Sequence, residues 1–152
     1  MNSMDLTFRN ASLSDHECIT PLIRAFYKEE SLVFPETTLN DNLNQLLGED
    51  GPGFIFLARE SGNAVGYAVL TLGFSIEFGG KFLLLDELYL VPAQRGIGNG
   101  RLFLEFLCDV GLRTEAKALR LEALRTSAQV AKFYTQFGFV LDSRDLMTKR
   151  LV

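Results

Sequence analysis

The residue types best suited to chemistry lie in one stretch, residues 85–101. An apolar segment carries two adjacent carboxylates, Asp86 and Glu87, and then enters a turn with three glycines in five residues, Gly96, Gly98 and Gly100. Helical periodicity begins directly after this turn. Glycines let the backbone approach a ligand closely, and the unpaired N–H groups at a helix start attract an anion. The stretch therefore predicts an anion site suited to pyrophosphate.

Spacing separates this turn from two other phosphate-binding loops. A Walker A loop requires GxxxxGK[ST], and no such string occurs in the chain. A dinucleotide fingerprint requires GxGxxG, but counting from Gly96 the sixth residue is Arg101, and counting from Gly98 it is Phe103. A purely structural turn stays open as an alternative, although three glycines are more than a simple turn requires.

The elements that must position these residues follow from hydrophobic periodicity. The chain has 152 residues and predicts alternating strands and helices without a linker. Strands are expected at about residues 5–9, 54–60, 64–72, 81–91, 119–123, 139–141 and 146–150. Helices are expected at about residues 14–29, 39–47, 99–115 and 127–137, the first with Ser14 as N-cap and Glu17 completing a capping box. Strict alternation would place Leu85, Glu87 and Tyr89 on one face of their strand and Asp86, Leu88 and Leu90 on the other.

Composition excludes several classes of protein. The chain is 47% hydrophobic and 22% charged, with a formal net charge of −4, so it can bury a core and lacks the basic excess of nucleic-acid binders. No apolar run reaches the roughly 20 residues of a membrane span. The first residues do not resemble a signal peptide. We therefore expect a cytoplasmic protein with neither nucleic-acid nor membrane partners.

Cysteine and histidine usage narrows the chemistry further. Two cysteines without CxxC spacing, Cys18 and Cys108, argue for a reducing compartment. A single histidine, His16, excludes His-rich metal sites and makes a Ser-His-Asp or Cys-His mechanism hard to build. We expect no metal and no side chain that carries a covalent intermediate.

Two motifs resemble those of the GNAT superfamily of acyl-CoA-dependent N-acyltransferases. The segment 95–100, RGIGNG, fits the family's Q/R-x-x-G-x-G/A signature, and 133–139, FYTQFGF, is similar to its FYxxxGF segment. The order of elements also agrees. The resemblance implies a single α/β domain over residues 1–152, with a mixed, mostly antiparallel sheet of six to seven strands flanked by about four helices.

The resemblance also implies how acetyl-CoA would bind. The strand backbone before the turn would bond the pantetheine arm, and the turn would hold the pyrophosphate, with charge-assisted contacts from its two arginines. Ser127 stands where the family often has a cofactor-contacting Asn. The cofactor-binding residues expected on this basis are Leu88, Tyr89, Leu90, Arg95, Gly96, Ile97, Gly98, Asn99, Gly100, Arg101 and Ser127.

The chemistry of amine acylation suggests the catalytic groups. An alkylamine has a reference pKa near 10.4 and attacks a thioester only when neutral, so its proton must be removed, and the leaving thiolate needs a proton. As the resemblance suggests, Tyr134 is the candidate general acid and Glu87 the leading candidate base. We expect Asp86 and Tyr27 at the acceptor site. Which of the two acids faces the amine stays open.

The sequence thus predicts an N-acetyltransferase that moves the acetyl group of acetyl-CoA directly to a primary amine in a ternary complex. The acceptor, a small molecule or a peptide, is not identified. A non-catalytic acyl-CoA-binding regulatory module and a plain interaction domain stay open as alternatives. The family resemblance makes a homodimer a common outcome.

Overall fold

The computed structural model describes residues 6–152, which fall into two compact units divided after Leu121. The first unit holds a sheet and three α-helices, and the second, Glu122–Val152, holds one α-helix. The two units are described separately below.

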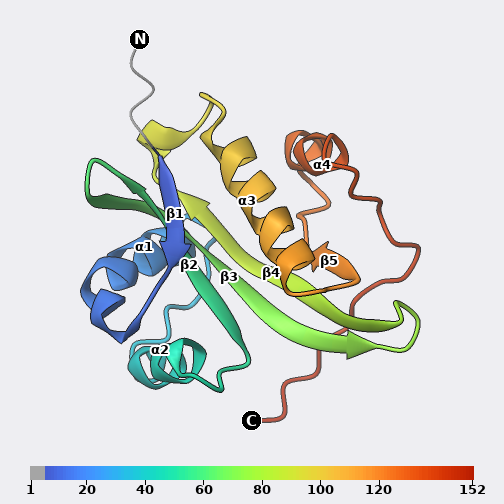
Figure 1. Ribbon diagram of the computed structural model, residues 1–152, viewed down its shortest axis with the longest axis horizontal. Helices are drawn as coiled ribbons and strands as arrows, with labels where there is room; N and C mark the ends of the chain where they lie inside the picture. The colour runs from blue at the N-terminus through green and yellow to red at the C-terminus, as the bar shows by residue number, and fades with distance from the viewer. Residues whose placement is uncertain (1–5) are drawn as a thin grey trace. The chain divides into compact units, whose positions relative to one another are not determined.

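The sheet of the first unit has its strands in sequence order, β1-β2-β3-β4-β5 (Figure 1). Three antiparallel pairs lead up to β4, and the last pair, β4 with β5, is parallel. The predicted mixed, mostly antiparallel sheet is therefore confirmed. The strands are β1 (Thr7–Asn10), β2 (Gly53–Glu60), β3 (Asn63–Ser75), β4 (Gly80–Leu90) and β5 (Ala118–Leu121).

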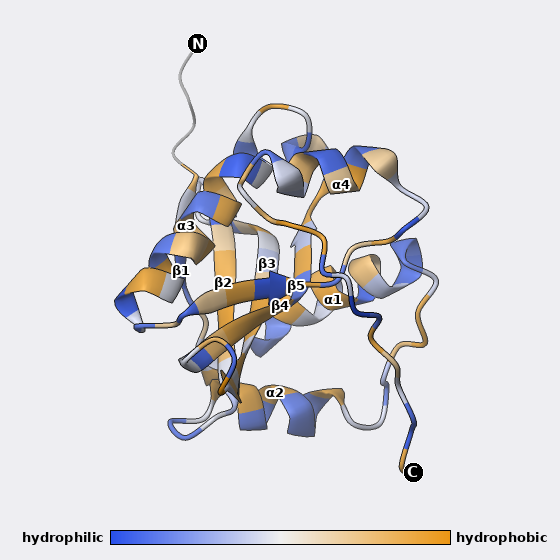
Figure 2. Ribbon diagram, turned by 90° about the vertical axis from the view of Figure 1, so that its right-hand side faces the viewer, coloured by the Kyte–Doolittle hydropathy of each residue, from blue (hydrophilic) through white to orange (hydrophobic). Residues whose placement is uncertain are grey.

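Four α-helices lie in the described residues, in agreement with the predicted number. Figure 2 shows α3 and α1 on opposite sides of the sheet. Short 3-10 turns at Leu13–Asp15 and Pro92–Gln94 precede α1 and the glycine turn. The α-helices are α1 (His16–Glu29), α2 (Leu39–Leu47), α3 (Asn99–Arg113) and α4 (Ala128–Thr135).

One hydrophobic core lies between the sheet and the pair α1 and α2. Helical spacing brings the apolar residues of both helices onto one side, and alternate residues of β2, β3 and β4 meet them. Burial of this apolar surface is the main force that holds the two helices to the sheet. The buried members are Ile19, Leu22, Ile23, Leu39, Leu43, Ile55, Leu57, Tyr67, Val69 and Tyr89.

The opposite face of the sheet packs against α3. The ring of Phe8 on β1 stacks on Phe103 at 4.7 Å and on Phe106 at 5.1 Å, and Phe56 on β2 meets Phe106 at 5.2 Å between ring centroids. Burial of both faces explains why the central strands read as apolar throughout. The glycine turn that begins α3 is thus carried on a well-packed helix.

The sheet has five strands within residues 6–152, so the predicted six to seven is wrong. Residues 139–141 and 146–150 were expected to be strands, but both segments are irregular. Val140, Leu141 and Met147 are each about nine-tenths exposed. Alternating apolar and polar residues show only that a segment could fit into a sheet. A strand also needs a neighbouring strand to bond with, and residues 139–141 and 146–150 pair with none in this structure.

The predicted alternation along β4 is also wrong at one point. Val69 on β3 is opposite Glu87, but the next residue, Leu70, is opposite Leu85, so Asp86 is an extra residue in the ladder. Such a β-bulge reverses the side-chain order. Glu87 therefore joins the face of Val69 and α1, while Leu85 joins the face of Leu70 and α3.

The residues that cap the start of α1 differ from the prediction, because α1 begins at His16 with Asp15 as its N-cap. Ser14 lies inside the 3-10 turn rather than at the N-cap, and the capping box is formed by Ser12 and Asp15. Asp15 also accepts two hydrogen bonds from the Arg9 guanidinium, at 2.7 and 2.8 Å. This buried carboxylate therefore joins β1 to the start of α1.

Replacing Asp15 by Asn is expected to lower the free energy of unfolding by about 2 kcal/mol at pH 7, because it removes charge-assisted hydrogen bonds from a buried site. Arg9 holds the folded-state pKa of Asp15 well below its usual range. The stabilisation is thus complete above the unfolded pKa of about 3.9 and declines as pH falls below it. Urea denaturation between pH 7 and pH 2.5 measures this difference.

Asp50→Asn, at an exposed turn position, is the matched control and should leave stability nearly unchanged. A wild-type advantage over Asp15→Asn that stayed constant down to pH 2.5 would contradict the predicted role.

None of the described helices is long and apolar enough to cross a membrane. Within residues 6–152, no three His, Cys, Asp or Glu side chains gather in a group that could hold a metal ion.

Candidate active site

The glycine turn has the backbone conformation that its composition suggests. Gly96 and Gly98 have φ values of +74° and +92°, in the left-handed region that other residues rarely adopt. Gly98 is the N-cap of α3, and a Cβ built at either glycine would meet no atom within 4 Å. The turn therefore presents bare backbone to open space, as an anion site requires.

The first amides of α3 precede the helical hydrogen-bond ladder. The first bond of the ladder runs from the N–H of Leu102 to the carbonyl of Gly98, at 3.1 Å. The N–H groups of Asn99, Gly100 and Arg101 come before it, and Gly98 has no side chain to cap them. With the helix dipole, these amides favour a bound anion.

The buried side chain of Gln94 holds the glycine turn through two hydrogen bonds. Gln94 is only 6% exposed, and its Nε2 donates to the Glu60 carboxylate at 2.7 Å. Its Oε1 accepts from Asn99 Nδ2 at 2.5 Å. Gln94 thus fixes the start of α3 to the end of β2. Asn99, which we predicted as a cofactor contact, already uses its side chain in this link.

Arg95 is engaged with α1 and β4 in this structure. Its guanidinium donates to both carboxylate oxygens of Glu29, each at 2.8 Å, and Nε donates to the Leu90 carbonyl at 2.8 Å. It also lies over the ring of Tyr89, 5.3 Å from the centroid. A phosphate contact by Arg95 stays a prediction, and it would compete with Glu29 for the same donors.

Glu87 receives a hydrogen bond on each carboxylate oxygen. Tyr27 of α1 donates to Oε1 at 2.7 Å, and Tyr67 of β3 donates to Oε2 at 2.8 Å. The structure therefore brings together two predicted site residues, Tyr27 and Glu87. It adds Tyr67, which the sequence analysis did not single out.

The environment of Glu87 shifts its titration. Burial raises the pKa of Glu87 above its usual value, the hydrogen bonds from Tyr27 and Tyr67 oppose this shift, and the neighbouring Asp86 carboxylate adds to it. Burial and the contact with Glu87 also raise the pKa of Tyr27 and of Tyr67. Both phenols therefore stay protonated near neutral pH, and Glu87 has the higher proton affinity that suits a base.

Among the described residues no strand pairs with β4 on the β5 side beyond Leu85, although the Leu90 carbonyl already accepts from Arg95 Nε. Pairing with β5 spans only Phe82–Leu85, so the predicted pantetheine segment, residues 88–90, bonds to β3 on one side and continues past the end of β5 on the other. Asp86 is the bulged residue itself and is exposed. An unpaired strand edge is a template for an extended ligand.

The remaining predicted residues fall at three further places. Ile97 is exposed at the tip of the turn, and Arg101 forms an ion pair with Glu105 one turn along α3. Ser127 and Tyr134 belong to the second unit. Ser127 is the N-cap of α4 and accepts from the Val130 N–H at 3.3 Å. Tyr134 packs against Phe133 and Phe139, and burial raises its pKa.

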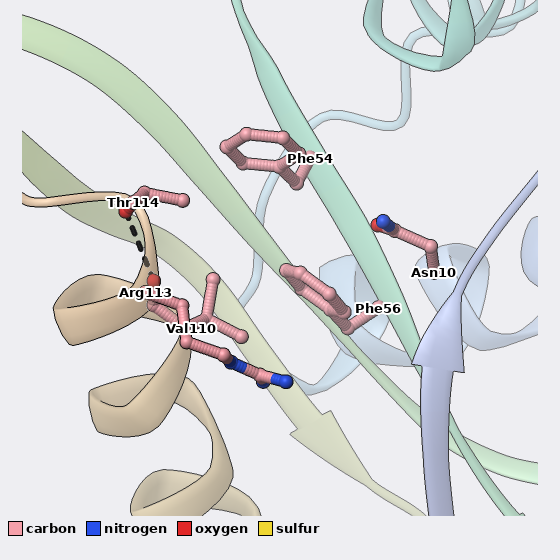
Figure 3. A pocket seen from close by; sticks show the side chains of 6 residues that line it. All are labelled: Asn10, Phe54, Phe56, Val110, Arg113 and Thr114. Carbon is pink, nitrogen blue, oxygen red and sulfur yellow. Dashed lines mark hydrogen bonds between the residues drawn. The ribbon is translucent and has the colours of Figure 1, made fainter.

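A pocket of about 300 Å³ lies elsewhere in the first unit (Figure 3). It lies between β2 and the C-terminal end of α3, on the face opposite Glu87. Figure 3 labels its lining residues, none of which we predicted as a site residue: Asn10, Phe54, Phe56, Val110, Arg113 and Thr114. The candidate active site is therefore an arrangement of strand edge, turn and carboxylate rather than this pocket.

Sequence reasoning missed the partners that hold the site residues. Tyr67 and Glu29 contact the predicted residues Glu87 and Arg95 from 20 and 66 positions away along the chain. Gln94 contacts Asn99 from five positions away and is itself bonded to Glu60, 34 positions away. One local signal was available for Tyr67, because it is the single hydroxyl in the otherwise apolar run 64–70. Nothing local marks the others.

Comparisons with known proteins agree with this arrangement of strand, turn and helix. The model of the acetyltransferase (GNAT) family matches residues 19–139, so the chain belongs to this family. The chain is 29% identical over 142 residues to the uncharacterized N-acetyltransferase YhfO of Bacillus subtilis (strain 168), covering 91% of this chain and 92% of the relative.

Two solved structures share the fold. An integron cassette protein from the mobile metagenome of Cole Harbour salt marsh is 30% identical, with a TM-score of 0.83 over 95% of this chain and 90% of its own. A possible acetyltransferase from Clostridium difficile 630 is 16% identical, with a TM-score of 0.85 over 97% of this chain and 98% of its own. The predicted α/β fold of GNAT type is confirmed.

Proposed function

We propose that this protein transfers the acetyl group of acetyl-CoA to a primary amine by direct attack in a ternary complex. The observation that carries the proposal is the Glu87 carboxylate, which accepts hydrogen bonds from two tyrosine hydroxyls and lies on the strand that leads into the glycine turn at the start of α3. Membership of the GNAT family supports the reaction class. Acetyl-CoA is a substrate in this scheme, and no metal takes part.

The chain binds acetyl-CoA through backbone groups. The turn amides from Gly96 to Arg101 take the pyrophosphate, and the backbone of residues 88–90, beyond the end of β5, takes the amide-bearing pantetheine arm. The net charge of −4 does not attract an anionic substrate. The affinity for acetyl-CoA must therefore come from backbone amides close to the bound pyrophosphate. The exposed Asp86 carboxylate instead favours a cationic amine.

The reaction balances with two proton-transfer groups. Glu87 removes one proton from the ammonium form of the acceptor, directly or through a water molecule, and the neutral nitrogen attacks the thioester carbonyl carbon. The C–S bond then breaks, and the thiolate takes the phenolic proton of Tyr134. The phenolate regains a proton from the acylated nitrogen, and Glu87 releases its proton to solvent. The products are the amide and the free thiol of CoA.

Replacing Gly98 by Asp is expected to weaken acetyl-CoA binding at least 100-fold. The new carboxylate would stand at the helix start where the pyrophosphate binds, and two like charges a few ångströms apart repel by about 1 to 4 kcal/mol. Isothermal titration calorimetry measures the loss.

Gly98→Asn is the matched control, because Asn has the same shape and also tolerates a positive φ but carries no charge. The Asn variant should lose less than about tenfold in affinity. Equal losses in the two variants would mean that backbone strain, and not anion binding, makes glycine necessary at this position.

The test of the proposed function is release of free thiol from acetyl-CoA, scanned across polyamines, amino acids, aminoglycosides and peptides. Amine-dependent thiol release is expected, with formation of the N-acetyl product by mass spectrometry. Tight acetyl-CoA binding without thiol release for any amine would favour an acyl-CoA-binding regulatory module instead. Two free cysteines support a reducing, cytoplasmic location as part of this proposal.

A further inference from the structure

The side chains that contact one another at Glu87 come from α1, β3 and β4, and aromatic rings surround the two tyrosines. Tyr67 of β3 is fully buried, with the rings of Phe26 and Tyr89 at 6.2 and 6.3 Å from its own. Tyr27 of α1 is half-buried between Phe26 and Phe34, at 5.8 and 6.0 Å. Both hydroxyls are therefore held in place by their rings, independently of Glu87.

We infer that Tyr67 is a positioning residue that, together with Tyr27, orients the Glu87 carboxylate for proton transfer. This inference rests on the proposed function, because it assigns Tyr67 a role in the reaction only through Glu87. Tyr67 has no exposed surface and so cannot contact the acceptor amine itself. We call the Tyr27, Tyr67 and Glu87 side chains the tyrosine clamp.

The clamp leaves Glu87 able to accept a proton. A carboxylate offers about four lone-pair sites, and the two phenols occupy one on each oxygen. Charge-assisted O–H donors also favour the ionised form, against the effect of burial. The carboxylate is thereby fixed in orientation and kept available as a base.

The charged and titratable groups around Glu87 are few in the part of the chain that the structure describes. Tyr27 acts from α1, Tyr67 from β3, and Asp86 from the same strand. Tyr89 lies on the same face of β4 and contacts the ring of Tyr67. The two phenols lower the pKa of Glu87, while burial and the Asp86 carboxylate raise it. Loss of one phenol should therefore move the titration of Glu87 upward.

Tyr67→Phe tests the clamp, because it removes the hydroxyl and keeps the buried ring. We expect the acid limb of the kcat/KM profile to move up by about one pH unit, the size expected for one hydrogen bond to a carboxylate. The KM for acetyl-CoA should change less than about twofold. An NMR titration of the Glu87 carboxyl carbon in the free full-length protein should move by the same amount.

Two further variants keep the test decisive. Thr71→Val removes a hydroxyl from the same strand, four residues from Tyr67 and outside the clamp, and should move neither measurement. Tyr27→Phe removes the donor to the other oxygen and should give a similar shift, and it replaces Tyr67→Phe if that variant does not fold.

The possible outcomes distinguish failure of the clamp inference from failure of the proposed function. Upward shifts in both measurements support the inference. An unmoved carboxyl titration overturns it and leaves the proposed function standing, provided that thiol is released. A shifted carboxyl titration with an unmoved acid limb also overturns it, and shows that Glu87 is not the base. Absence of thiol release from the wild type overturns the proposed function, and with it the role of Tyr67 in catalysis.

Discussion

Glu87→Gln is expected to lower kcat/KM for the amine acceptor by about 10² to 10⁴, the range typical of general acid–base catalysis. An alkylamine with a pKa near 10.4 is almost entirely protonated at neutral pH, so removal of its proton limits attack. Gln has the size of Glu but cannot take the proton. The variant should regain rate as pH rises, because hydroxide and bulk water then deprotonate the amine.

Asp86→Asn is the informative comparison, since the sequence left open which acid faces the amine. Asp86 is exposed in the bulge, whereas Glu87 is held by two tyrosines. We expect Asp86→Asn to raise the KM for a cationic amine less than about tenfold and to spare kcat. Steady-state kinetics on both variants, with calorimetry to confirm unchanged acetyl-CoA binding, would assign the base. The reverse order of effects would transfer the role to Asp86.

Tyr134→Phe is expected to lower kcat by about 10² to 10⁴ and to leave acetyl-CoA affinity within about threefold. Burial raises the pKa of Tyr134, so the phenol is protonated over the neutral range and can donate to the leaving thiolate. Phe keeps the ring that packs on Phe133 and Phe139, so the fold should be retained. Stopped-flow detection of thiol release separates the chemical step from product release.

Thr135→Val serves as the control for Tyr134. Its hydroxyl donates to the Lys132 carbonyl within α4 and has no part in the proposed reaction. The control should keep wild-type kcat. A Tyr134→Phe variant with an undiminished rate would remove Tyr134 from the mechanism and leave protonation of the thiolate to solvent.

Local signals in the chain predicted much of the secondary structure. Helix α2 has the predicted bounds of residues 39–47, since apolar periodicity and a terminal glycine both act within a few residues. The glycine turn is likewise local, because positive φ at Gly96 and Gly98 is a property of the residue type. The prediction of two terminal strands was wrong because strand formation depends on a neighbouring strand that is distant in sequence. The alternation of residues 139–150 contains no information about such a neighbour.

The bulge at Asp86 shows the limit of periodicity most clearly. Two adjacent carboxylates on a strand predict one acid on each face, but not which face is which. The register between Val69 and Leu70 decided this, because one extra residue in β4 placed Glu87 on the side of α1. Register is set by the sum of contacts across the whole sheet, so a single strand cannot reveal it.

The sequence by itself identified the acetyltransferase family, the glycine turn and the candidate proton-transfer groups, because residue type and short spacing define backbone freedom and acid–base chemistry. Only the tertiary structure decided which groups act on one another. Tyr27, Tyr67 and Glu87 come from α1, β3 and β4, and their hydrogen bonds at 2.7 and 2.8 Å exist because α1 packs against the face of the sheet on which Tyr67 and Glu87 lie. The proton affinity of Glu87 is therefore a property of the folded core rather than of the residue.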